Sequence, residues 1–122
     1  MNEQQPAGRN IDLDLARQRL GEDADDVLPI VAQALLEECP QRIEELQGAL
    51  ANQDAEALLR TAHTLKGAVK IFAAADVMEV AARIEQCART GDLAAVPDLI
   101  PRLKQDAERM MNELRASFPV SP

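Results

Sequence analysis

The sequence is poor in aromatic and basic residues, and both shortages narrow the range of possible functions. Its 122 residues include two Phe, no Tyr and no Trp, so it offers no aromatic platform on which single-stranded bases could stack. The 13 Lys and Arg are outnumbered by 21 Asp and Glu, which gives a formal net charge of −8. Because binding to nucleic acid depends on surplus basic side chains that displace counterions, we expect no nucleic-acid partner.

Long hydrophobic runs are also missing. No apolar stretch approaches the roughly 20 residues of a membrane span, and the first six residues lack the basic and apolar segments of a signal peptide. We therefore expect a cytoplasmic protein that makes no contact with a membrane. Hydrophobic residues still make up 47% of the chain, which is enough for the core of one folded domain.

Residues that bind metals are scarce as well. Cys39 and Cys87 lie far apart in apolar helical patterns, and His63 is the only histidine. This set has no zinc-like spacing, so the sequence predicts two buried free thiols and no metal site or cofactor on this chain.

The residues that are present have a helical pattern. Residues 1–10 and 119–122 are predicted to be flexible tails, and residues 11–118 the folded domain. After a short helix closed by Gly21, four longer amphipathic segments begin near Asp23, Ala55, Asp76 and Val96. Because short turns join them, we expect an all-α fold, an antiparallel up-down-up-down four-helix bundle with the short N-terminal helix packed across one end.

The first long segment is predicted to be one helix with a bend at Pro40, or two nearly collinear helices. Pro97 and Pro101 lie in the N-terminal part of the last helix. Either its first turns are irregular, or the helix begins later than its apolar stripe suggests. The apolar stripe expected to face the core of the first long segment is Val27, Val31, Leu35, Cys39, Ile43, Leu46 and Leu50.

Polar residues and glycines indicate where the helices begin and end. Asp54 is a plausible N-cap for a helix that runs to about Ala74. Asp76, followed by a glutamate three residues later, resembles a capping box that opens the third long helix. Gly91 is expected to end that helix, and Asp92 to cap the next one.

The helix predicted for residues 55–74 has an unusual outer face. At about 100° per residue from His63, the core stripe clusters at roughly 180° to 260° and consists of Leu58, Ala62, Leu65, Val69 and Phe72. Arg60, Lys66, Gly67 and Lys70 fall within about 60° of His63 on the opposite face. The only histidine is therefore predicted to be exposed among three cations, in a chain that is strongly acidic.

Gly67 favours a functional role for this face over the alternative that its polar residues only keep the helix solvated. A glycine inside a helix costs about 1 kcal/mol relative to alanine, and on the outer face it cannot serve helix packing. It leaves bare backbone beside the imidazole of His63, where another protein could approach closely. An exposed imidazole acts as a nucleophile without a buried base, and the cations suit phosphate, so we predict phosphorylation of His63. Lys66, Lys70 and Arg60 would offset the added negative charge.

The segment Ala62-His63-Thr64-Leu65-Lys66-Gly67-Ala68 resembles the signature of histidine phosphotransfer (HPt) domains of bacterial phosphorelays. The resemblance runs from about Ile11 to Phe118. It implies that His63 accepts a phosphoryl group from an aspartyl phosphate on a receiver domain and passes it to another receiver. It also assigns Lys66 to the phosphate and Gly67 to the close approach of the receiver.

The same resemblance implies the partners. They are response-regulator receiver domains, a hybrid histidine kinase, or both; magnesium belongs to the receiver, and this chain is a monomer without kinase activity of its own. Receiver docking is expected to use apolar residues beside His63, namely Leu59 and Ile71, with Leu13 or Leu15 of the first helix. Packing of the first helix onto the bundle explains these apolar residues about equally well.

Lys66→Ala is expected to slow transfer and leave folding almost untouched.

Three positions depart from the common pattern of the family. Lys70 replaces a small residue and could strengthen the phosphate site or narrow the set of receivers. Ala73 stands where glycine is frequent, which suggests a less sharply broken helix end. Some relatives place a glutamine beside the histidine; Glu85 stands there in this chain, and we do not count it as a site residue because a carboxylate pointing inward would repel phosphate.

Two other functions stay open from the sequence. One is the phosphoacceptor domain of a chemotaxis-type histidine kinase, in which a separate ATP-binding domain phosphorylates the histidine. The other is a module that binds receivers without exchanging phosphate. Whether the chain is free-standing or a domain of a hybrid kinase is also open.

Overall fold

The computed structural model describes residues 10–119, and these form helices and no strand. The all-α prediction is therefore confirmed for that part of the chain. The helices are α1 (Leu13–Leu20), α2 (Ala24–Ala51), α3 (Ala55–Val69), α4 (Ala75–Thr90) and α5 (Val96–Ser117), with short 3-10 turns η2 (Gly21–Asp23) and η3 (Lys70–Phe72). The tails predicted for residues 1–10 and 119–122 lie almost entirely outside the described residues.

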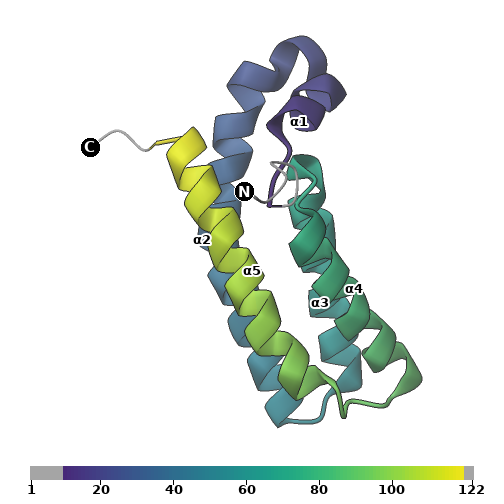
Figure 1. The fold of residues 1–122 in the computed structure, drawn as a ribbon. Coiled ribbons are helices and arrows are strands. Elements are labelled where there is room, and N and C mark those ends of the chain that lie inside the picture. Colours follow the sequence, from purple (N-terminus) through teal and green to yellow (C-terminus); the bar gives the residue numbers. More distant parts are fainter. Residues whose placement is uncertain (1–9, 120–122) are drawn as a thin grey trace, which may run out of the picture.

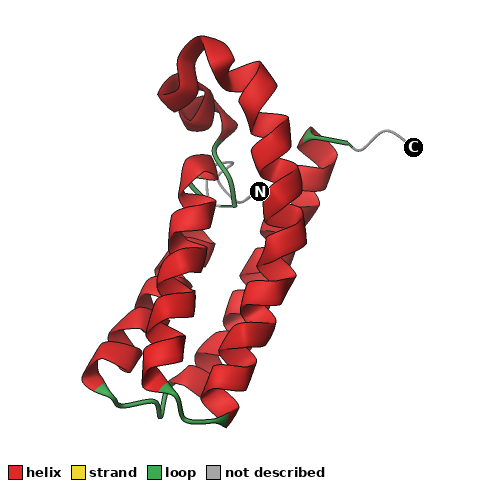
Figure 2. Cartoon of the chain, turned by 180° about the vertical axis from the view of Figure 1, so that it is seen from behind, coloured by secondary structure: helices red, strands yellow, loops and turns green. Residues whose placement is uncertain are grey.

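The four long helices lie side by side and share one hydrophobic core (Figure 1). Packing joins α2 to α3, α3 to α4, α4 to α5 and α5 back to α2. The α2–α3 and α4–α5 connections meet at one end of the molecule, and the α3–α4 connection lies towards the other (Figures 1 and 2). Within residues 10–119, no helix is long and apolar enough to cross a membrane.

Helix α2 is one continuous helix that contains both Pro29 and Pro40. Its buried stripe differs from the prediction in the first half, where Leu28 and Ala32 are buried instead of Val27 and Val31. The predicted stripe is correct at Leu35, Cys39, Ile43 and Leu46, while Ala49 is buried and Leu50 is only half-buried.

Several predicted helix ends are confirmed. Asp54 caps α3 by accepting a hydrogen bond from the amide of Ala57 at 3.1 Å. Gly21 and Gly91 end α1 and α4 with positive φ angles of 66° and 81°, which glycine adopts without strain. The prolines do not delay α5, which begins at Val96.

Three predicted ends are wrong. The α3 segment stops being α-helical at Val69, and Ala73 adopts the left-handed conformation with φ 51°, so the chain breaks there as sharply as a glycine would allow. Asp76 lies inside the first turn of α4, whose N-cap is Ala74. Asp92 accepts a hydrogen bond from the amide of Ala94 in the turn before α5, so it caps that turn and not the helix.

Helix α1 is fastened to the end of α3 by two hydrogen bonds. The amide of Asp12 donates to the carbonyl of Phe72 at 2.7 Å, and Nη1 of Arg19 donates to the carbonyl of Lys70 at 2.9 Å. The carbonyl of Lys70 also accepts a hydrogen bond from the amide of Ala73 at 2.9 Å, so Arg19 adds a second donor to it. The first helix is thereby held against η3, directly after the end of α3.

Candidate functional site

His63 lies in the middle of α3 and projects away from the core. All five residues of the predicted core stripe of this segment are fully buried: Leu58, Ala62, Leu65, Val69 and Phe72. The side chain of His63 is 69% exposed, as its position on the helix predicts.

Glu85 of α4 is the unexpected member of the site. Its side chain is 2% exposed, and its Oε2 lies 2.7 Å from Nδ1 of His63. The other oxygen, Oε1, accepts a hydrogen bond from Nζ of Lys66 at 2.5 Å. The sequence leaves Glu85 outside the predicted site, but in the structure this one carboxylate contacts both His63 and Lys66.

A third cation completes the surroundings of Glu85. Nη2 of Arg89, one turn further along α4, lies 3.6 Å from the same Oε2 that faces His63. Burial by itself raises the pKa of Glu85, but the hydrogen bonds from Lys66 and His63 outweigh it and hold the pKa below its ordinary value. Glu85 is thus an ionised carboxylate at neutral pH.

The ionised carboxylate determines how the imidazole is oriented. A carboxylate can only accept hydrogen bonds, so Nδ1 of His63 must carry the hydrogen. In the neutral ring Nε2 then has the lone pair. From the sequence alone, the imidazole is predicted to have no buried base beside it; in the structure the buried carboxylate of Glu85 contacts Nδ1 and determines the tautomer.

Two of the predicted accessory residues share a groove with His63. The groove has a volume of about 360 Å³ and runs between α3 and α4. It is lined by Glu56, Leu59, Arg60, His63, Thr64, Glu85 and Arg89. Arg60 and Arg89 therefore place two positive charges on the Glu56 side of the imidazole, and Leu59 supplies apolar surface.

The other predicted residues lie apart from this groove. Lys66 and Lys70 line a second hollow, on the other side of His63 along α3. Ile71 lies in η3 and packs against the core, as does Leu13 of α1, which fits the packing interpretation of these apolar residues. At Gly67 an added Cβ would meet nothing within 4 Å, so the gap beside the imidazole is open to solvent.

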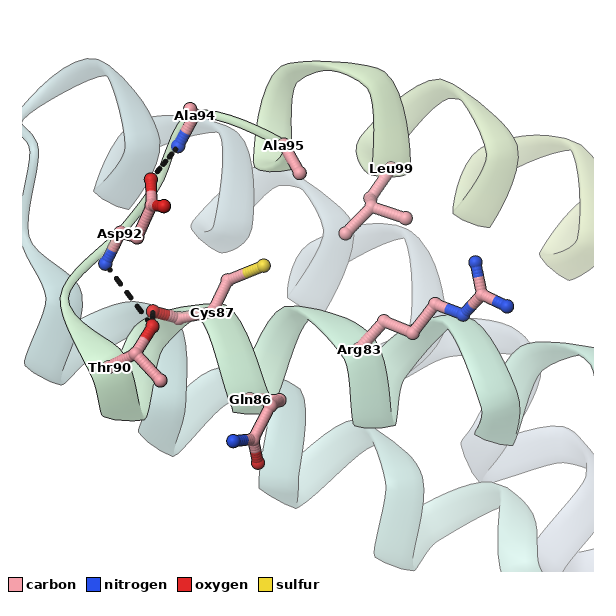
Figure 3. Close-up of a pocket in the computed structure, with 8 residues that line it drawn as sticks. All are labelled: Arg83, Gln86, Cys87, Thr90, Asp92, Ala94, Ala95 and Leu99. Atoms are coloured by element: carbon pink, nitrogen blue, oxygen red, sulfur yellow. Dashed lines mark hydrogen bonds between the residues drawn. The ribbon is translucent and has the colours of Figure 1, made fainter.

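The cysteines take no part in the site. Cys39 and Cys87 are both free thiols; Cys39 is buried, and burial raises its pKa to about 11, while Cys87 is only half-buried, contrary to the prediction. Cys87 points into an apolar hollow between the end of α4 and the start of α5 (Figure 3), which contains neither His63 nor Lys66. Across residues 10–119, no group of three or more His, Cys, Asp or Glu side chains is arranged to hold a metal ion.

Sequence reasoning missed Glu85 and Arg89, although a signal for Glu85 exists. Glu85 follows Ala81 by four residues and precedes Ala88 by three, so it occupies a position of the buried stripe of α4. A carboxylate at such a position needs cationic partners, and α3 carries Lys66 on its outer face.

Comparison with known proteins identifies a matching family and a similar fold. The family model described as Hpt domain matches residues 31–116, a range that includes His63, Lys66, Gly67 and Glu85. A search of curated proteins found no match. The fold is similar to the crystal structure of histidine-containing phosphotransfer protein B (HptB) from Pseudomonas aeruginosa PAO1, with a TM-score of 0.80, 22% sequence identity, and coverage of 92% of this chain and 96% of that one.

The family match covers most of the chain, and its range contains an exposed histidine whose Nδ1 is held by a buried carboxylate. This chain belongs to the Hpt domain family, the histidine-containing phosphotransfer domains of phosphorelays.

Proposed function

We propose that this chain is a phosphotransfer intermediate that accepts a phosphoryl group on Nε2 of His63 from a receiver aspartyl phosphate and passes it to another receiver. The observation that carries the proposal is the contact between Nδ1 of His63 and the buried Glu85. It leaves Nε2 with the lone pair on a side chain that is 69% exposed. A nucleophile on such a surface is open to a phosphate delivered by another protein.

The transfer step balances without any group from outside the two proteins. The lone pair of Nε2 attacks phosphorus, the N–P bond forms, and the P–O bond to the receiver aspartate breaks. The aspartate leaves as a carboxylate, and Nδ1 keeps its hydrogen. Because the ring gains positive charge as the N–P bond forms, the ionised Glu85 at 2.7 Å stabilises the transition state and the product.

The basic residues have separate roles in this proposal. Arg60 and Arg89 line the groove that contains His63 and would offset the charge of the incoming phosphate. Lys66 is held by Glu85 at 2.5 Å, so its ammonium group stays beside the imidazole instead of extending into solvent. Gly67 leaves room for the backbone of the receiver.

The remaining expectations belong to the same proposal. The bundle is taken as antiparallel and up-down-up-down, with α1 as an addition at one end, an arrangement that the short connections between consecutive helices support. The chain acts as a cytoplasmic monomer without kinase activity, and the receiver holds the magnesium ion. The folded domain is residues 11–118.

A phosphotransfer profile tests the proposal. Each receiver domain of the source organism is phosphorylated with a radioactive phosphoryl group and mixed with this chain. We expect rapid labelling from at least one receiver, with a label that is lost in acid and retained in alkali, as phosphohistidine requires. His63→Gln is expected to abolish it. Labelling that survives in His63→Gln, or no labelling from any receiver, contradicts the proposal.

The same assay separates the two alternatives. A phosphoacceptor domain of a chemotaxis-type kinase would be labelled by ATP and a separate catalytic domain, and not by phosphorylated receivers. A receiver-binding module would bind receivers equally well before and after His63→Gln and would never carry the label.

The role of Glu85 as a positioning residue has its own test. Glu85→Gln keeps the size of the side chain and removes its charge, so the ring is less stabilised as the N–P bond forms. We expect the rate of transfer at saturating receiver to fall by about tenfold or more, with little change in KM. The control is Glu108→Gln on the exposed face of α5, which should transfer normally. A normal rate in Glu85→Gln would contradict the role.

A further inference from the structure

A second basic hollow lies beside the phosphotransfer groove and shares only Lys66 with the chemistry proposed above. It has a volume of about 430 Å³ and is bordered by α1, α3, η3 and α4. Three cations and an apolar floor line it, together with one glutamate: Arg19, Lys66, Lys70, Ala73, Ala75, Met78, Ala82 and Glu79.

The charge of this hollow opposes that of the whole molecule. The chain has a net charge of −8 and only three lysines, yet two of them, Lys66 and Lys70, lie here. The one acidic lining residue, Glu79, already pairs with Arg83 at 3.5 Å. The lining therefore presents positive charge around an apolar floor, which suits an apolar side chain flanked by carboxylates.

The cations of the hollow are held in place by the fold. Nη1 of Arg19 donates to the carbonyl of Lys70 at 2.9 Å, which uses one of the five N–H donors of the guanidinium group. The bond between Asp12 and Phe72 fastens α1 at the same junction. Because these residues come from α1 and η3, which lie far apart in the sequence, the hollow exists only when both elements are docked.

The hollow is linked to the phosphotransfer site by the hydrogen bond between Lys66 and Glu85. Lys66 lines it and donates to Oε1 of Glu85, whose other oxygen contacts His63. Any protein that covers His63 to deliver a phosphoryl group has this hollow at the edge of its footprint. A receiver is therefore the occupant that the geometry favours.

We propose that this hollow selects among receivers by binding an apolar side chain of the receiver that is flanked by Asp or Glu, with Arg19 and Lys70 as the specificity-determining residues. The proposal rests on the proposed function, since the occupant is the phosphorylated receiver itself. Lys66 serves both the hollow and the chemistry, so the test avoids it.

Lys70→Glu is the variant of choice, because it reverses one charge and leaves the carbonyl that Arg19 binds. Lys104→Glu is the matched control: it makes the same change at the third lysine, which is exposed on α5 and far along the chain from the hollow. Transfer kinetics are measured with the receiver that the wild-type chain accepts fastest. We expect Lys70→Glu to raise KM for that receiver by about tenfold or more, with kcat changed much less, and Lys104→Glu to leave both near wild-type values.

Two further measurements make the outcome decisive. Melting temperatures show whether Lys70→Glu is folded; if it is not, Lys70→Met, which keeps the length and removes the charge, takes its place with an expected KM increase of several-fold. High salt should raise KM of the wild-type chain and reduce its difference from Lys70→Glu, since exposed charges are screened.

The failure of this proposal can be told from the failure of the proposed function. If no receiver labels the wild-type chain, the proposed function is wrong, and the proposal that the hollow selects among receivers is wrong as well. If the wild type is labelled but Lys70→Glu and Lys104→Glu have the same KM, only the selection by the hollow is overturned. If Lys70→Glu changes only the self-association of the chain and not KM for the receiver, the hollow binds a second copy of this chain, and the proposal that it selects receivers is overturned.

Discussion

Glu85 is a buried carboxylate surrounded by three groups that are or can become cationic. Lys66, His63 and Arg89 approach it at 2.5, 2.7 and 3.6 Å. A buried carboxylate loses its hydration and is tolerated only because these partners replace it. These contacts therefore contribute both to the stability of the fold and to the environment of His63, so a substitution at any one of these residues affects both.

Lys66→Ala is expected to lower the stability of the fold, contrary to the expectation from sequence that folding would be almost untouched. It removes the partner of Oε1 and leaves the buried Glu85 with one hydrogen bond fewer, which costs about 1 to 2 kcal/mol of unfolding free energy. Urea denaturation at pH 7 measures this. Lys104→Ala, on the exposed face of α5, is the control and should stay within about 0.5 kcal/mol of wild type.

The double variant Lys66→Ala/Glu85→Gln shows whether the loss arises at Glu85. In the Glu85→Gln background there is no buried charge to be stranded, so adding Lys66→Ala should cost much less than it does in wild type. An equal cost in both backgrounds would attribute the destabilisation to lost packing. The pH dependence gives a second check: because the pKa of Glu85 is lowered in the fold, its stabilising contribution is present above its ordinary value of 4.5 and is lost as the pH falls below it.

At the scale of residues, the sequence predicts a site whose members lie on one helix and misses those on another. His63, Lys66 and Gly67 fall on one face of α3 because three- and four-residue spacing fixes that geometry. Glu85 lies 22 residues from His63 on α4, and only the docking of two helices brings them together. Glu85 points inward only if α4 is rotated about its axis by the right amount. The apolar pattern of α4 predicts that rotation approximately, which is not enough to predict a contact between two side chains.

At the scale of elements, the junction between α3 and α4 holds backbone strain. Ala73 has a φ of 51°, in the left-handed region that an alanine adopts only at a cost of about 1 to 2 kcal/mol. The conformation is maintained by the packing around it: Phe72 is fully buried, and its carbonyl receives the amide of Asp12. The tertiary structure therefore imposes on this alanine a turn that local propensity disfavours.

Ala73→Gly is expected to stabilise the protein by about 1 kcal/mol, because glycine enters the left-handed region without steric conflict. Thermal and urea unfolding measure the change. Ala34→Gly is the control: Ala34 is exposed in the interior of α2, so glycine there relieves no strain and should lower stability by up to about 1 kcal/mol. A loss of stability in Ala73→Gly as large as that in Ala34→Gly would contradict the strain.

Two glycines inside helices of residues 10–119 permit a sharper test of close approach. Gly67 in α3 and Gly48 in α2 are both exposed, and an added Cβ meets nothing within 4 Å at either position. Gly67→Ala and Gly48→Ala are therefore both expected to raise stability, by up to about 1 kcal/mol. Gly67→Leu should block transfer from the receiver by filling the gap beside His63, whereas Gly48→Leu should relay normally.

Measured together, the stability and transfer of the four glycine variants decide the role of Gly67. Normal transfer by a stable Gly67→Leu would remove the argument that this glycine admits a partner. Equal inhibition by Gly48→Leu would attribute the effect to helix properties in general.

The stripe of α2 shows why the existence of a helix is easier to predict than its orientation. The predicted residues Val27, Val31, Leu35, Cys39 and Ile43 are spaced by four, and at about 100° per residue this carries the stripe about 160° around the helix. The buried stripe includes a step of three between Ala32 and Leu35 and so keeps its direction. Alanine gives a weak hydrophobic signal, which is why Ala24 and Ala32 were missed beside the larger valines.

At the scale of the whole molecule, acidic and basic charges are segregated. Positive side chains gather around His63 and the hollow beside it, although the net charge is −8. Elsewhere two acidic residues of α4 act on the carboxyl group of Asp106 in α5. The pKa of Asp106 is raised, first by burial and then by the negative charge of Asp76, while Arg109 and Arg102 oppose the shift.

Asp106→Asn is expected to stabilise the bundle at neutral pH. Because the pKa of Asp106 is raised in the fold, the folded chain retains a proton that the unfolded chain releases, and stability is lost as the pH rises above the ordinary value of 3.8. Asparagine removes this buried charge and keeps an oxygen that can accept from Arg109, which lies 3.3 Å from Asp106.

The melting temperature of Asp106→Asn should therefore exceed that of wild type at pH 7.5, and the difference should shrink as the pH is lowered towards 4. Glu108→Gln is the control, since it makes the same change from carboxylate to amide on the exposed face of α5 and should show no such convergence. If Asp106→Asn is less stable than wild type at pH 7.5, then its pairing with Arg109 outweighs the cost of burial. In that case the contact between α4 and α5 depends on an ionised Asp106.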